Sequence, residues 1–452
     1  MGYLRAMRAG ALAVAMSMLP AAVQAESLRQ ALESAYLNNP DIMSALLNVK
    51  ATAENIVLAK SAKRPFISAS GSVTGAFAAE SGLPVTTDFS YTAGLNYTQT
   101  LFDNFKTDAE IEQARALTEL SKYALRNSEQ NVLLSVAQAY YGVIRDTQLV
   151  TLYASNITFF DAQVSSAQDR LRLGEGTKID VSQAQTRQIA AVAQYRSAIA
   201  SLQTSQASYE RWVGHKPTGL VYTFNFGKSL PTSIESAVTS AEERHPVLLS
   251  ARAAIRVAQA GSDAASAAFG PTLNLIGSLC GIGCFGTTPG ISGSARLTLS
   301  IPIYSGGALG AGLRQANIEQ IQSEVDALSA RDQIRESVIS AWATLQNATS
   351  QITSAQSAVD SSQLVVEGTI QERDVGQATT LDVLNAQSEL TTAQIVLITA
   401  RATKMIAAFA LLSSAGKLSP EVLGLNVPVH SADGYVATIE DVWAELRAID
   451  EH

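Results

Sequence analysis

The stretch LRLGEGTKIDVSQAQ, residues Leu171–Gln185, decides the fold because a near copy, RDVGQATTLDVLNAQ, occupies Arg373–Gln387. The two copies are 202 residues apart (373 − 171 = 202). QARAL and QANIE keep this offset, as do AYYGV and AWATL, while NPDIMSA and HPVLLSA near the start are 206 residues apart (245 − 39 = 206). Such self-similarity indicates that the chain consists of two copies of one supersecondary unit.

The beginning of the chain has the pattern of a secretory signal peptide. Arg5 and Arg8 form a basic region, AGALAVAMSML an apolar core, and VQA, ending at Ala25, a small-residue cleavage site. The pattern predicts that residues 1–25 are a signal peptide and that the exported protein begins at Glu26.

Composition excludes several classes of protein. With 47% hydrophobic residues the chain is not disordered, and 32 Lys and Arg against 40 Asp and Glu make nucleic acid an unexpected partner. The apolar stretch Ile395–Leu412 carries Arg401 and Lys404 near its middle, and each would be costly in hydrocarbon. We therefore expect a packed helix there, not a membrane span.

Two structural repeats, 26–230 and 231–425, share one predicted plan: a helix, a proline, two strands, a very long helix, a tight turn and a helix. The tail, 426–452, carries no assignable motif. The first helix of each repeat is predicted to run without a break, over about Ser27–Ala62 and Ser233–Ala268. The prolines that stop these helices, at the predicted joins between helix and barrel, are Pro65 and Pro271.

Period-two alternation predicts four strands. In Phe89–Leu101, Phe89, Tyr91 and Leu95 alternate with small and hydroxyl residues. A half-buried soluble sheet would also alternate, but a small, hydroxyl-rich face is typical of an outer-membrane barrel with a wet lumen. Four strands cannot close a barrel, so the chain must oligomerise, and the residues alone do not choose between two and three copies. The predicted strands are about 66–78, 89–101, 272–279 and 291–303.

The long helices, about 104–173 and 309–375, contain no proline. At 1.5 Å per residue each is a rod of roughly 100 Å, about three times the hydrocarbon thickness of a bilayer. Such rods project away from the membrane and need partners along their length, as coiled coils do.

Glycines reverse the chain at the far end of each rod, and a threonine then restarts a helix. Thr177 and Thr379 fit the N-cap position, and Asp180 and Asp382 follow three residues later, which is the capping-box pattern with Asp in place of Glu.

No catalytic, cofactor or metal site is predicted, and we expect no enzyme. The four histidines are scattered, and Gly306–Leu313, GGALGAGL, lacks the Gly-Lys-Ser/Thr ending of a phosphate loop, which favours a plain joint between strand and helix. The two cysteines, Cys280 and Cys284, could form a small loop disulfide outside the cytoplasm or be two small buried residues at a hairpin tip.

These features together resemble the TolC family of outer-membrane channels, which serve efflux pumps and type I secretion. The duplicated units, IPIYSGG after the last strand and VGQATTLDVLNAQ at the tip carry the resemblance, which extends to about Leu425. It implies a mainly α protein with a membrane β-barrel: a homotrimer in the outer membrane of a Gram-negative bacterium, with a 12-stranded barrel in lipid continued by a long periplasmic α-helical barrel.

The resemblance also implies a passive exit duct opened at its periplasmic mouth by partners. These are a periplasmic adaptor (membrane fusion) protein and an inner-membrane ABC or proton-driven transporter. The repeated turns would form the mouth, six in a ring. The residues predicted to dock the adaptor are Leu173, Gly174, Gly176, Thr177, Val375, Gly376 and Thr379.

In the family, an aspartate of the first turn is bound to an arginine and a tyrosine of the second. Asp180 matches that aspartate, whereas Ala378 replaces the arginine and Arg373 the tyrosine. We therefore predict a gate pair of Asp180 and Arg373.

Two further aspartates of the family line the pore. Asp382 matches one, and Asn385 stands in the place of the other. One acidic ring is predicted at the constriction, where it would attract cations.

The alternative is a non-conducting trimeric scaffold or adhesin of the outer membrane, which would also combine long helices with an oligomeric barrel. A pore in lipid discriminates between the two. The sequence does not identify the cargo.

Overall fold

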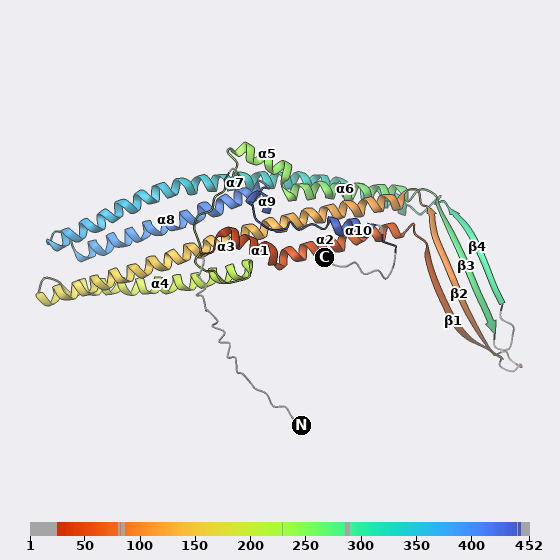
Figure 1. Ribbon diagram of the computed structural model, residues 1–452, viewed down its shortest axis with the longest axis horizontal. Coiled ribbons are helices and arrows are strands. Elements are labelled where there is room, and N and C mark those ends of the chain that lie inside the picture. The colour runs from red at the N-terminus through yellow and green to blue at the C-terminus, as the bar shows by residue number, and fades with distance from the viewer. Residues whose placement is uncertain are drawn as a thin grey trace, which may run out of the picture.

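The structure, a computed structural model, describes residues 25–79, 82, 86–227, 229–284, 290–440 and 442–443. The predicted signal peptide lies outside these residues, except for Ala25. Long helices lie side by side along the molecule, and four strands extend from one end at an angle to them (Figure 1).

The same order of elements occurs twice, as predicted. The first repeat contains α1 (Leu28–Asn38), α2 (Pro40–Ser61), β1 (Phe66–Ala78), β2 (Thr86–Phe102), α3 (Lys106–Leu173) and α4 (Lys178–Val213). The second contains α5 (Ile234–Arg244), α6 (Pro246–Ala267), β3 (Thr272–Cys284), β4 (Gly290–Ser300), α7 (Ala308–Asp374) and α8 (Thr380–Ser414). Two short helices follow, α9 (Pro420–Leu423) and α10 (Asp433–Glu440).

The prediction of one unbroken first helix in each repeat was wrong. Asn39 and His245 have ψ near 125° and 124°, because the residue before a proline is driven out of the helical region. Pro40 and Pro246 then open a new helix, where the missing N–H is not needed. The Asn39 and His245 side chains cap it by accepting a hydrogen bond from the backbone N–H two residues on, at 2.9 and 3.2 Å.

The four strands form one antiparallel sheet in the order β1-β2-β3-β4, so the two repeats meet at β2 and β3. Hydroxyls pair across it, Ser72 with Thr92 at 2.7 Å and Ser278 with Ser294 at 2.8 Å. Large apolar side chains on both outer strands are exposed, as in Phe77 (80%) and Ile291 (83%). Because β1 and β4 stand at the two ends of the strand order, they are open edges of the protomer, with backbone groups free to pair with further strands.

Strand β3 holds both cysteines, four residues apart. At about 3.3 Å per residue their Cα atoms are about 13 Å apart, beyond the roughly 7 Å that a disulfide spans. Cys280 is a half-buried free thiol. The possible loop disulfide is thus not formed, because the segment expected to be a loop is strand.

The strand-to-helix joints need two consecutive left-handed residues. In the second repeat these are Gly306 (φ 63°) and Gly307 (φ 87°), which explains GGALGAGL as a joint. In the first repeat the same places are taken by Asn104 (φ 57°) and Phe105 (φ 67°). Other residues than glycine adopt this region at a cost of about 1–2 kcal/mol. The Asn104 side chain offsets part of it by donating to the Ala267 carbonyl at 3.0 Å.

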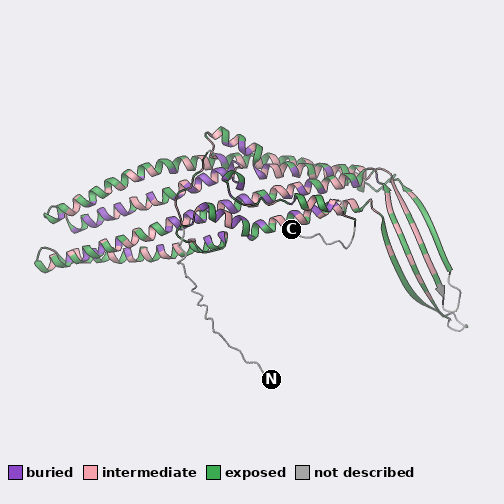
Figure 2. Cartoon of the chain, viewed as in Figure 1, coloured by how far each residue is buried: buried purple, intermediate pink, exposed green. Residues whose placement is uncertain are grey.

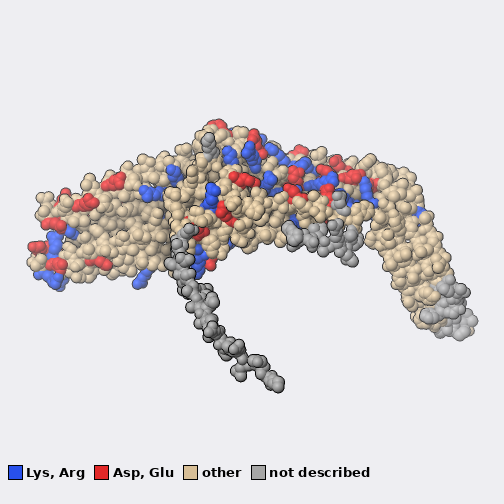
Figure 3. Space-filling view, viewed as in Figure 1, with Lys and Arg blue, Asp and Glu red and all other residues tan. Residues whose placement is uncertain are grey.

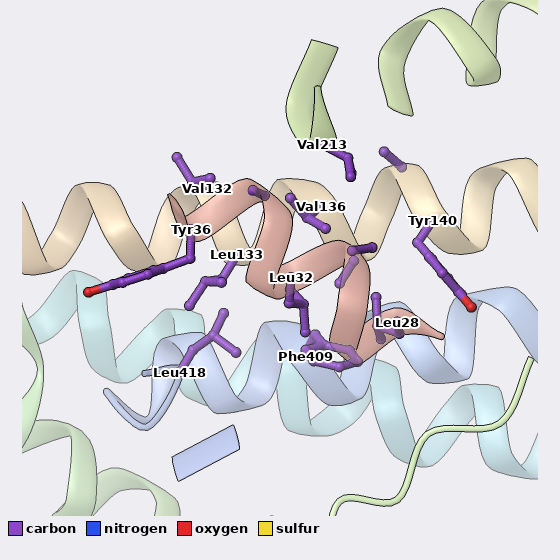
Figure 4. Packing of buried hydrophobic residues seen from close by; sticks show 14 of the residues in the cluster. Leu28, Leu32, Tyr36, Val132, Leu133, Val136, Tyr140, Val213, Phe409 and Leu418 are labelled. Carbon is purple, nitrogen blue, oxygen red and sulfur yellow. The ribbon is translucent and has the colours of Figure 1, made fainter. Parts of the chain in front are cut away.

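A buried cluster at the middle of the helices holds the protomer together (Figures 2 and 4). Leu32 and Tyr36 of α1 pack against Leu133 and Tyr140 of α3 and Phe409 of α8, and all five are fully buried. Full burial of such a side chain contributes about 1.5–3 kcal/mol. This cluster fixes the crossing of the two repeats and so the direction of both helical hairpins.

Within the described part of the chain, two helices, α2 and α8, are long and apolar enough to cross a membrane. In α8, half of the most apolar window is buried inside the protomer, and Leu397, Met405 and Phe409 are among its buried residues. The prediction of a packed helix at Ile395–Leu412 is confirmed.

Candidate functional site

The candidate site is the pair of hairpin tips at the end of the molecule away from the strands (Figure 1). Helix α3 ends at Leu173 and is capped by Gly174 (φ 79°), whose N–H donates to the Leu171 carbonyl at 3.2 Å. Helix α7 ends at Asp374. Gly376 (φ 80°) lies two residues further on, and its N–H donates to the Arg373 carbonyl at 3.0 Å. Left-handed glycines stop both helices without the cost of a Cβ, so the two turns have the same local cause.

Capping boxes restart the chain at both tips, as predicted. Asp180 accepts from the Thr177 backbone N–H at 2.9 Å and from its hydroxyl at 2.7 Å. Asp382 accepts from the Thr379 N–H at 2.9 Å and hydroxyl at 2.6 Å. The hydroxyl bond is the main reason that the pKa of each carboxyl lies below its ordinary value, followed by the backbone bond. Both carboxylates therefore stay ionised in mild acid.

The two tips present apolar side chains at equivalent places. Leu173 and Val375, 202 residues apart, are 75% and 71% exposed, and Ile179 and Leu381 follow with 68% and 38%. These exposed side chains would be accessible to an adaptor, and adaptor docking at the turns stays a prediction.

The two residues of the predicted gate pair, Asp180 and Arg373, bond to other partners within one protomer, and their pairing stays a prediction. Arg373 is buried and donates to Asp374 Oδ1 at 2.8 Å and to Gln163 Oε1, across the contact of α7 with α3. The carboxylate of Asp180 is held instead by its own cap.

Arg170 takes the place next to Asp180. A cavity of about 190 Å³ between the tips is lined by Arg170, Glu175 and Asp180 of the first tip and by Ala378 and Thr379 of the second, among others. The charge of Arg170 also lowers the pKa of Asp180, as the smallest of the causes. Ala378, which replaces the arginine of the family, thus faces an arginine supplied by the other tip. The sequence offered no signal for Arg170. Arg170 and Asp180 lie on either side of a turn, so the spacing rule for contacts along one helix does not apply to them.

The predicted constriction residues lie together on α8. Asp382 and Asn385 are both exposed and are three residues apart, so they lie on one face, about 4.5 Å apart along the helix axis. Asn385 Oδ1 accepts a hydrogen bond from Arg187 Nη2 of α4 at 3.0 Å. Arg187, which the sequence analysis missed, joins the two hairpins.

A groove of about 530 Å³ runs beside this bond. It is lined by Lys178, Ile179, Ser182, Gln183, Thr186, Arg187 and Leu381. The lining contains two cations and no carboxylate. Figure 3 shows that charged side chains gather at the tips and around the middle of the helices, with few over the strands in this view.

The remaining predicted residues lie at the joins or outside the site. Pro65 lies between α2 and β1, and Pro271 between α6 and β3, so both mark the helix-to-strand joins as expected. Among the described residues, no group of three or more His, Cys, Asp or Glu is placed to hold a metal ion.

Comparison with known proteins identifies this architecture. The sequence matches the family described as Outer membrane efflux protein over residues 31–215 and 237–417, one segment in each repeat. It is 33% identical over 434 residues to the outer membrane efflux protein BepC of Brucella suis, covering 95% of this chain and 94% of BepC. To the outer membrane protein TolC of Escherichia coli it is 25% identical, over 89% of this chain and 85% of TolC.

A solved structure supports the fold. The CmeC outer membrane channel of Campylobacter jejuni matches with a TM-score of 0.79 at 15% identity, over 92% of this chain and 89% of that chain. The matched segments cover both repeats, with their helices, strands and tips. The chain therefore belongs to the outer membrane efflux protein family.

Proposed function

We propose that this chain is the outer-membrane exit duct of a tripartite efflux pump or a type I secretion system. The observation that carries the proposal is the open four-stranded sheet at one end of helices about 100 Å long. A sheet in lipid cannot leave an edge unpaired, so β1 and β4 must pair with other copies to form a barrel. The duct itself is passive and catalyses no reaction.

Exposed apolar stripes support assembly. On α7, Ile318, Ile321, Val325 and Leu328 follow one another at spacings of three and four residues and are 55–64% exposed. That spacing is typical of a coiled-coil seam, which a helix of a neighbouring copy would cover. Three copies would supply twelve strands and, with two tips each, a ring of six tips at the mouth. Family membership favours three copies over two.

The tips support adaptor binding. Leu173 and Val375 are apolar and exposed at the extreme end of each hairpin, at equivalent places. Single exposed apolar residues are common, but two at matched positions form a repeating surface that a helical adaptor could contact at every tip. Energy for transport would come from the inner-membrane ABC or proton-driven transporter bound through that adaptor.

Arg170 and Asp180 are the best candidates for closing the mouth. They share the cavity between the tips, next to Ala378 and Thr379 of the second hairpin. Movement of one tip away from the other would separate this pair, which belongs to the first hairpin, from Ala378 and Thr379 of the second. Arg170→Ala and Asp180→Ala should each raise the open probability, and the double variant should open no further than the single ones. Arg172→Ala, which removes an exposed arginine paired with Asp169, is the matched control.

The decisive experiment is single-channel recording of the purified mature protein in a planar bilayer. Discrete current steps, together with a trimeric mass, would support the duct. Divalent cations that block wild type but not Asp382→Ala would place the acidic ring at the constriction; equal block of both would move the constriction elsewhere.

A protein that inserts but passes no current, even with Arg170 and Asp180 replaced, would contradict the duct. That outcome would favour the second reading, a non-conducting trimeric scaffold or adhesin in outer-membrane lipid.

A further inference from the structure

The groove beside the predicted constriction carries charge that an acidic ring does not explain. Lys178 and Arg187 both line it, and no carboxylate does. Of these two cations, Arg187 is the one whose position is set, because its Nη2 donates to Asn385 Oδ1 at 3.0 Å. The bond links α4 to α8 and holds a guanidinium next to a predicted pore residue.

The carboxylate and the guanidinium lie at different levels. Asp382 and Asn385 are about 4.5 Å apart along the axis of α8, with Asp382 nearer the tip. The guanidinium therefore lies about one helical turn further in than the carboxylate. An amide acceptor does not neutralise it, whereas an aspartate at position 385 would. Arg187 is half-buried, so its charge is screened less than that of a fully exposed side chain.

We propose that Arg187 determines the ion selectivity of the mouth. The proposal rests on the proposed duct: in a ring of copies, each Asp382 would be followed inward by an Arg187, so an acidic ring at the tip would be backed by a basic ring. A cation drawn in by the first ring meets like charge at the second, and an anion meets the reverse. The mouth is then weakly selective, and anionic solutes can pass it.

The test is the reversal potential of single channels under a salt gradient. Arg187→Gln keeps a side chain that can bond Asn385 and removes the charge. We expect the permeability ratio of K⁺ to Cl⁻ to rise by about two- to threefold, because a positive charge that repels K⁺ and attracts Cl⁻ is removed from a narrow pore. Arg187→Lys keeps the charge and should leave the ratio close to wild type.

The matched control is Arg196→Gln. Arg196 is exposed and lies nine residues further along α4, which places it about half a turn round the helix from Arg187. The Arg196→Gln substitution removes one positive charge per chain from the same helix but from the opposite face. The permeability ratio of K⁺ to Cl⁻ should therefore not change.

A purely structural role for Arg187 has a different signature. If the bond to Asn385 only joins the hairpins, Arg187→Gln would change the conductance or open probability and leave the permeability ratio at the wild-type value. That result would overturn the proposal. Absence of any current from wild type would instead contradict the proposed duct.

Arg187→His guards against loss of assembly in the glutamine variant. One preparation can be recorded with the imidazole charged in mild acid and neutral in mild alkali. Asp382 stays ionised across this range because hydrogen bonds from Thr379 hold the pKa of its carboxyl low. We expect the ratio to rise on going from acid to alkali in this variant and to change less in wild type; equal change in both would contradict the proposal.

Discussion

Helices α3 and α7 occupy equivalent places in the two repeats and have nearly the same length, 68 and 67 residues. They differ in burial: 23 residues of α3 are buried within the protomer and only 5 of α7. Figure 2 shows the same contrast, with α7 largely exposed along its length. Two copies of one unit have thus diverged, one as the core of the protomer and the other as a surface.

The contrast has a physical consequence. Helix α3 packs mainly against α1, α2, α4, α6 and α8, whereas α7 packs mainly against α5, α6 and α8. A helix of this length without partners on its outer face is stable only because the other side is packed. The unburied stripe of α7 is therefore the part of the protomer that a neighbouring copy would complete.

The largest expected effect is in the core of α3. Leu133 is fully buried, so Leu133→Ala should lower the free energy of unfolding by about 2–5 kcal/mol whatever the state of assembly. Chemical denaturation of the refolded protein measures it. A loss under about 1 kcal/mol would mean that α3 is not the core of the protomer.

A pH-dependent difference between the repeats comes next. Burial lowers the pKa of the His245 imidazole from 6.5 to about 4, so the folded state keeps it neutral. Because the unfolded chain binds the proton more readily, stability is full above pH 6.5 and falls as the pH drops toward 4. The loss from this residue is about 3–4 kcal/mol at most, since each unit of pKa shift is worth about 1.4 kcal/mol.

The first repeat supplies the control for that prediction. Asn39 makes the same cap without a titrating group. His245→Asn should therefore keep the helix break and flatten the dependence of the unfolding free energy on pH between 6.5 and 4. An unchanged slope in the variant would assign the acid sensitivity to other groups.

A substitution in the exposed stripe of α7 should affect the stability of an isolated protomer and of the assembled protein differently. Leu328 is 55% exposed, and Leu328→Ala should change the stability of an isolated protomer by no more than about 0.5 kcal/mol. If a neighbouring copy covers it, the assembled protein should lose about 1–2 kcal/mol per chain, by loss of buried apolar area. Unfolding measured above and below the assembly concentration separates the two. Equal small effects would mean that the stripe is not an interface.

The smallest effect concerns the strand-to-helix joints. Phe105 is left-handed where the second repeat has Gly307. Phe105→Gly should raise the free energy of unfolding by about 0.5–1 kcal/mol by relieving that conformation. Gly307→Ala is the converse: a Cβ there would meet no atom within 4 Å, so the expected loss of about 1 kcal/mol is conformational alone. A loss of stability in Phe105→Gly would show that the ring contact with Phe102 outweighs the strain.

Local interactions explain what could be predicted in advance. The alternation of the strands, the proline-free rods and the two capping boxes depend on residues within a few positions of one another, so their spacing is visible in the chain. The duplication is visible because these local patterns recur at an offset of 202 residues. The helix breaks at Asn39 and His245 are equally local, and the proline after each was the available signal. Of the two alternatives left open for the cysteines, the disulfide required a loop at Cys280, where the strand continues and the thiol is free.

Contacts between distant segments could not be predicted in this way. Arg373 bonds to Gln163, Arg170 shares a cavity with Ala378 and Thr379 of the other hairpin, and Arg187 bonds to Asn385, 198 residues away. Which side chains of one hairpin contact which side chains of the other depends on how the two hairpins rotate and slide against each other. The fully buried cluster around Tyr36, Leu133 and Phe409 sets that rotation. Spacing along the chain specifies helices, strands and turns, whereas the packing of the two repeats determines which side chains contact one another near the tips.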